Sequence, residues 1–126
     1  MKHNTMLTVA ALLSLLFLTL HITDDIVRGI SKAESSNTAL LILAVFLYGT
    51  LVLPERRLGH VIMLLIGLFA AAMPVMHMLG AHYGEIAKSP GGFFFVWILW
   101  ALGGLGGFTL ILSARGLWDL RRSRPQ

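Results

Sequence analysis

The stretch GHVIMLLIGLFAAAMPVMHML, from Gly59 to Leu79, decides the fold class because it is long and apolar enough to cross a membrane. At about 1.5 Å of helix rise per residue, about 20 residues span a hydrocarbon core of about 30 Å. The stretch holds no Asp, Glu, Lys or Arg, each of which would cost about 2.5 to 3.5 kcal/mol near mid-membrane. The sequence therefore predicts a transmembrane helix here.

Three more runs share this character: Thr5 to Ile22, Thr38 to Leu53 and Phe93 to Ser113. The second is short, but local thinning of the bilayer can accommodate a short span. Only 13% of the chain is charged, against about 25% in a soluble domain. We predict an all-α integral membrane four-helix bundle, one domain over residues 1–126, in a bacterial inner (plasma) membrane.

The first run, with Lys2 before it, also resembles a secretory signal, but the residues from Leu18 to Ile22 lack the paired small residues of a cleavage site. We expect it to be retained. The positive-inside rule then sets the orientation. With both termini inside, seven basic residues lie inside and three outside: Lys2, Arg56, Arg57, Arg115, Arg121, Arg122 and Arg124 against Arg28, Lys32 and Lys88.

The connections between runs predict how neighbouring helices pack. Apolar residues continue at helical spacing past Ile22, which predicts that the first helix extends beyond the outer surface. Ser35, Ser36 and Asn37 then form a turn. The tight inner turn from Pro54 to Arg57 makes spans two and three antiparallel neighbours, and residues 89–92 form a second outer turn.

Most polar residues fall at the outer surface in this topology, whereas His3 and His60 fall inside. His21 precedes Asp24 and Asp25 by three and four positions, so one carboxylate shares its helix face. His82 precedes Glu85 by three. The first and third helices are therefore each predicted to end in a His-x-x-acid step, a weak internal repeat.

Imidazole and carboxylate groups suit transition metals, and thioethers favour Cu(I). Met73, Met76 and His77 share a helix face beside Pro74, which is expected to kink the helix. His and Met are also axial ligands of haem. We predict that His21 and His77 form one outer site for copper, iron or zinc, or for haem. The candidate ligands are His21, Asp24, Asp25, His77, His82, Glu85, Met73 and Met76.

A structural interpretation of the same residues stays open. Asp24 can pair with Arg28, four positions on, while Asp25 and Glu85 are solvated. The histidines then sit at the headgroup level, and the methionines fill the helix packing.

Gly103 and Gly107 have GxxxG spacing, which lets helix backbones approach closely in lipid. The alternative function is therefore an accessory or assembly subunit, in a homo-oligomer or a larger membrane complex. A small transporter is a third option, disfavoured because the inner half of the spans lacks a polar lining.

The absence of cysteine excludes disulfides and thiolate chemistry. Nucleic acid is not an expected partner, because the basic residues lie at span ends without interleaved aromatic residues. The sequence contains no Walker, Ser-x-x-Lys, Gly-x-Ser-x-Gly or His-Glu-x-x-His motif, so catalytic residues remain unassigned.

Overall fold

A computed structural model describes residues 2–30 and 37–123, and every regular element within them is a helix. The predicted all-α fold class is confirmed. The predictions for Lys32, Ser35, Ser36 and Arg124 concern residues outside the described ranges. In chain order the helices are α1 (His3–Val27), α2 (Thr38–Val52), α3 (Arg57–Met78), α4 (Tyr83–Lys88) and α5 (Gly92–Arg122).

Three helices, α1, α3 and α5, are long and apolar enough to cross a membrane by length and composition. The fourth apolar helix, α2, has 15 residues and so extends only about 22 Å. Crossing a core of about 30 Å with α2 requires a thinned bilayer. The fourth span therefore stays a prediction, as does the orientation of the chain.

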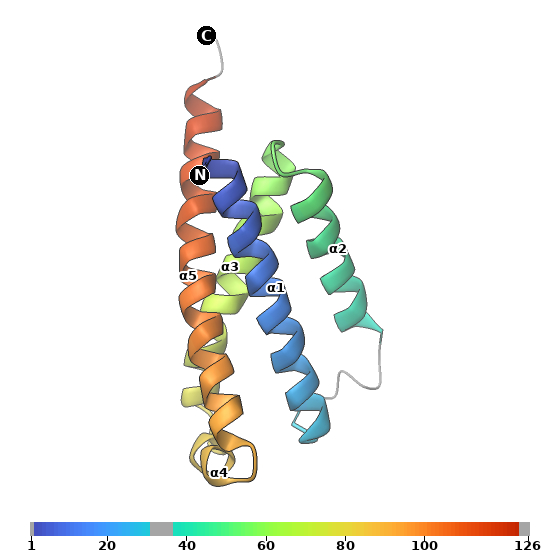
Figure 1. The fold of residues 1–126 in the computed structure, drawn as a ribbon, viewed down its shortest axis with the longest axis vertical. Helices are drawn as coiled ribbons and strands as arrows, with labels where there is room; N and C mark the ends of the chain where they lie inside the picture. The colour runs from blue at the N-terminus through green and yellow to red at the C-terminus, as the bar shows by residue number, and fades with distance from the viewer. Residues whose placement is uncertain (1, 31–36, 124–126) are drawn as a thin grey trace.

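The four longer helices, α1, α2, α3 and α5, run alternately up and down the bundle (Figure 1). α1 and α3 run in the same direction, and α5 packs along both of them. α2 lies beside α3 and runs against it, as the tight turn predicted. The end of the bundle where α1 and α3 finish is called the His21 end, and the end where they begin is called the His3 end.

Side chains from α1, α3 and α5 fill the interior. The core includes fully buried residues from all three helices: Leu7, Ala11, Met63, Ile66, Ala70 and Leu102. Large apolar side chains also cover the outside, among them Leu16, Leu68 and Trp100. An apolar exterior around a close-packed interior is expected of helices surrounded by lipid, since packing drives their association there.

Glycine lets α5 approach α3 closely. A Cβ at Gly106 would lie 2.6 Å from the Cβ of Ala70, and one at Gly103 would lie 2.7 Å from Cγ of Pro74. Nothing lies within 4 Å of the corresponding position at Gly107. The prediction that Gly103 and Gly107 share a packed face is therefore wrong for Gly107. The second glycine of α5 that packs against α3 is Gly106, three positions after Gly103.

The helix ends differ in part from those expected. α1 continues to Val27, so the helix extends past Ile22 as predicted. That this extension lies beyond the outer membrane surface stays a prediction. α3 ends at Met78, and the short α4 occupies part of the expected outer connection. Glu85 in its first turn and Lys88 in its last complement the helix dipole. α5 continues well past the predicted end of the fourth span.

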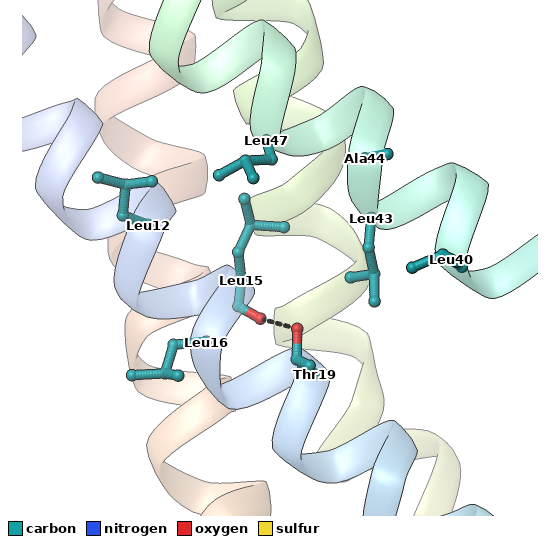
Figure 2. A pocket seen from close by; sticks show the side chains of 8 residues that line it. All are labelled: Leu12, Leu15, Leu16, Thr19, Leu40, Leu43, Ala44 and Leu47. Atoms are coloured by element: carbon teal, nitrogen blue, oxygen red, sulfur yellow. Dashed lines mark hydrogen bonds between the residues drawn. The ribbon is translucent and has the colours of Figure 1, made fainter.

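An apolar groove of about 450 Å³ separates α1 from α2 (Figure 2). Thr19 is the polar residue in its lining, and its hydroxyl donates to the Leu15 carbonyl at 2.8 Å. The side chains that line the groove are therefore almost all apolar.

Candidate metal centre

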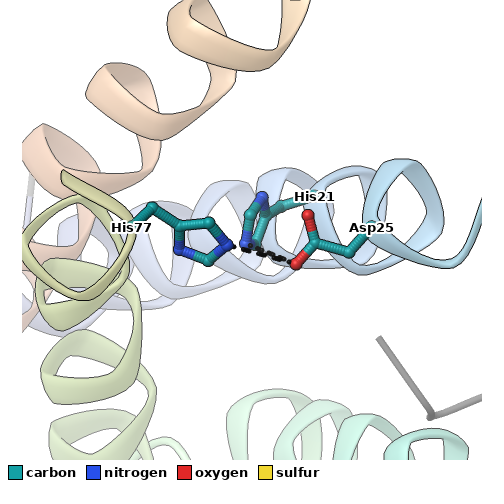
Figure 3. Close-up of side chains that lie close together, drawn as sticks. All are labelled: His21, Asp25 and His77. Carbon is teal, nitrogen blue, oxygen red and sulfur yellow. Dashed lines mark hydrogen bonds and ion pairs between the residues drawn. The ribbon is translucent and has the colours of Figure 1, made fainter. Parts of the chain in front are cut away.

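Three titratable side chains converge at the His21 end (Figure 3). Oδ2 of Asp25 lies 3.4 Å from Nε2 of His21 and 3.3 Å from Nε2 of His77. One candidate ligand atom from each residue lies within 4.8 Å of the other two. The structure therefore brings His21 and His77 together at one carboxylate oxygen.

Local helix geometry explains this convergence. His21 and Asp25 lie four positions apart on α1, so their side chains share a face. Their approach requires α1 to remain helical past the predicted end of the span, which it does. His77 occupies the last turn of α3. α1 and α3 run in the same direction, and their last turns meet where Asp25 lies 3.3 Å from His77.

The cluster is buried but incompletely hydrogen-bonded. His21 is 1% exposed and Asp25 is 8% exposed. Both ring nitrogens of His21 and Oδ1 of Asp25 are buried without a hydrogen-bond partner among the described residues. Leaving such groups unpaired costs about 1 to 3 kcal/mol each, and more for a charge. The expectation that Asp25 is solvated is therefore wrong, and the arrangement favours a cation between these groups.

The hydrogen bond of His77 fixes which nitrogen faces that position. Nδ1 of His77 lies 3.0 Å from the Met73 carbonyl oxygen. A carbonyl only accepts, so Nδ1 carries the hydrogen. In neutral His77 the lone pair of Nε2 then points at the Asp25 carboxylate. Two lone pairs face each other favourably only with a proton or a metal ion between them.

The spacing suits a metal ion. Two ligands held about 2.0 to 2.1 Å from one ion at the tetrahedral angle lie about 3.3 Å apart. The separations of Asp25 from His21 and His77 are 3.4 and 3.3 Å. The carbonyl that accepts from His77 Nδ1 is also a usual partner for a metal-bound imidazole, because it fixes the ring orientation.

A haem does not fit between the same two rings. The porphyrin plane of a bis-histidine haem holds the imidazole centroids roughly 6 Å apart at Fe–N bonds of about 2 Å. The centroids of His21 and His77 are 4.6 Å apart in an edge-on arrangement. The haem alternative is therefore disfavoured for this packing.

Phe95 and Arg28 enclose the cluster. The Phe95 ring, 1% exposed, has its centroid 6.1 Å from that of His21 and 5.6 Å from that of His77. Arg28 donates to Asp24 at 2.8 Å and to the hydroxyl of Ser89 at 2.8 Å. Asp24 is thus held by Arg28 outside the cluster, as the structural interpretation proposed.

The sequence did not single out Phe95 or Ser89. Phe95 stands in a run of three phenylalanines, where nothing marks the inward-facing one. Ser89 appeared only as part of a turn. The start of α5 brings Phe95 to the cluster, and Ser89, which follows α4, contacts Arg28.

His82 and Glu85 lie outside the cluster. They contact each other at 3.4 Å, and their side chains are 80% and 82% exposed. His82 is the N-cap of α4, not the end of α3. The predicted repeat of a His-x-x-acid step at two helix ends is therefore wrong, because α3 stops at Met78 and because His21 contacts Asp25 rather than Asp24.

The two methionines of the candidate set also lie apart from the three ligands. Met73 packs against Leu18, Ala70 and Leu102 in the apolar core. Met76 is 63% exposed on the outside of α3. Neither position supports a thioether site for Cu(I) with His77.

Comparison with known protein families, curated proteins and solved structures found no match for this chain. The functional argument therefore rests on the geometry of the cluster.

Proposed function

We propose that this integral membrane protein binds a divalent transition-metal ion through His21, Asp25 and His77 and acts in metal handling. One observation carries the proposal: two imidazole nitrogens approach the same carboxylate oxygen at 3.3 and 3.4 Å. The unpaired, buried atoms of His21 and Asp25 support it.

The donor set selects the class of ion. Two imidazoles and one carboxylate are typical of Zn²⁺ sites and of mononuclear Fe²⁺ sites. Three protein ligands leave at least one position for water or an incoming ligand. We favour zinc because the two separations from Asp25 match those of tetrahedral coordination, and because an open fourth position lets an ion be exchanged.

We further propose that all four apolar helices span a bacterial inner membrane, with both termini in the cytoplasm and the ion site near the outer surface. The excess of basic residues on the inner connections supports this orientation. A reporter fused after Gln126 should be active on the cytoplasmic side. Activity only outside would reverse the orientation.

The direct test is the metal content of protein purified in detergent without a histidine tag. His21→Ala and His77→Ala should each remove one equivalent of bound Zn²⁺, because each deletes a ligand. His82→Ala is the matched control, since His82 is exposed on α4. Co²⁺ loaded in place of Zn²⁺ should show tetrahedral visible absorption that the first two variants lose.

Unchanged metal content in His21→Ala and His77→Ala would overturn the proposal. A loss of stability without a loss of metal would show instead that a proton joins Asp25 to the imidazoles.

A further inference from the structure

A second pair of imidazoles faces inward at the opposite end of the same two helices. His3 lies in the first turn of α1, and His60 lies in the first turn of α3. His60 is 2% exposed. His3 and His21 are about five helical turns apart and therefore share a face of α1.

The absence of a side chain at Gly116 brings these imidazoles together. A Cβ at this position of α5 would lie 2.6 Å from Nε2 of His60 and 3.2 Å from Nε2 of His3. The two nitrogens are therefore separated by no more than the sum of those distances. Gly116 leaves open the space that both nitrogens border.

The hydrogen-bonding state of the rings leaves lone pairs for a cation. Nδ1 of His60 lies 3.1 Å from the Arg56 carbonyl oxygen and must donate to it. Nε2 of neutral His60 is then an acceptor. Nε2 of His3 is buried without a hydrogen-bond partner among the described residues. A buried imidazole nitrogen that borders this space therefore lacks a hydrogen-bond partner, as buried polar atoms at the His21 end do.

Two exposed carboxylates line the same space, although among the described residues neither forms with both imidazoles a group whose ligand atoms all lie within 4.8 Å of one another. His3 and His60 line a cavity of about 400 Å³ whose wall also contains Glu55 and Asp119. Glu55 comes from the turn before α3, and Asp119 comes from α5 one turn past Gly116. Imidazole and carboxylate are the combination found at the His21 end.

We propose that His3 and His60 form a second site for a divalent transition-metal ion, and that the exposed side chain of Glu55 or Asp119 moves in as the carboxylate ligand when the ion binds. This site uses none of the residues of the first and is tested separately from it. The protein then binds one ion at each end of the α1–α3 pair.

The test uses full-length, untagged protein in which His21→Ala and His77→Ala remove the first site. This background should retain one equivalent of Zn²⁺, and adding His3→Ala or His60→Ala should remove it. In the protein with an intact first site, the same two substitutions should leave one equivalent, which also shows that the variants fold.

A matched pair of glycine substitutions tests the geometry. Gly116→Ala puts a methyl group beside both nitrogens and should displace the imidazoles. In the same background, Zn²⁺ affinity should fall about 10- to 100-fold, which is the usual cost of losing a group that orients a metal ligand. Gly104→Ala on the same helix meets nothing within 4 Å and should leave affinity unchanged. Retention of the second equivalent in the His3 and His60 variants, or equal affinities of the two alanine variants, would overturn the proposal.

Discussion

The termini of α1 and α3 place opposite partial charges beside the imidazoles at the two ends of this pair. At the His21 end, both helices finish, so their dipoles place negative partial charge there. At the His3 end, both helices begin, the partial charge is positive, and Lys2 lines the cavity. Only at the His21 end does a carboxylate contact both rings. From this comparison we expect helix direction and carboxylate position, beyond the presence of histidine, to set how strongly each end binds a cation.

The largest expected effect comes from removing the carboxylate that distinguishes the His21 end. Asp25→Asn should lower Zn²⁺ affinity at that end by more than about 100-fold, because loss of a group that merely orients a ligand already costs about 10- to 100-fold. Isothermal titration in the His3→Ala background measures this single site.

The neighbouring Asp24→Asn is the control for that substitution. It removes the same charge from α1, but Asp24 pairs with Arg28 at 2.8 Å outside the cluster. Its affinity should stay within a few-fold of the parent protein. Equal losses in the two variants would show that net charge alone, and not ligation by Asp25, holds the ion.

The next effect concerns the α3–α5 contact, on which both ends depend. Gly106→Leu should lower stability by about 1 to 3 kcal/mol or more, because its side chain would overlap Ala70. Gly107→Leu points into open space and should be nearly neutral. Thermal unfolding in detergent, followed by circular dichroism, compares the two. Equal tolerance would remove the support for close packing at Gly106.

The contribution of helix direction should be smaller than that of the carboxylate. Two helix termini of opposite sign, at about 0.3 to 1 kcal/mol each, should add roughly tenfold to the tighter binding at the His21 end, beyond the effect of Asp25. Zn²⁺ titration of His60→Ala, which retains the first site, and of His21→Ala, which retains the second, provides the two affinities. Tighter Zn²⁺ binding at the His3 end would contradict the proposed effect of helix direction on affinity.

The smallest effect lies between the ends, where Ser14 and Thr109 share a buried hydrogen bond of 3.1 Å from α1 to α5. A double-mutant cycle of Ser14→Ala and Thr109→Val should give a coupling of about 0.6 kcal/mol, the usual value within membranes. Both ion sites should keep their affinity. A larger coupling accompanied by metal loss would show that this pair connects the sites.

Much of the architecture follows from local sequence alone. Long runs without charge predict helices because a helix satisfies its backbone polar groups within one segment, as the bilayer requires. The tight turn at Pro54 makes α2 and α3 neighbours, and the helical spacing past Ile22 extends α1. These features depend on residues close together in the chain. The pairing of Gly103 with Gly106, rather than with Gly107, depends on the rotation of α5 against α3, which spacing does not specify.

The candidate site divides in the same way. The sequence by itself determined that His21 and Asp25 share a helix face and that His77 lies at a similar depth, since helical periodicity and parallel spans fix both. Only the tertiary structure decided that Asp25, and not Asp24, contacts both imidazoles, that Met76 and His82 lie outside, and that Gly116 opens a space beside His3 and His60. These outcomes follow from helix rotation and from where each helix ends, because both result from side-chain packing between segments distant in the chain.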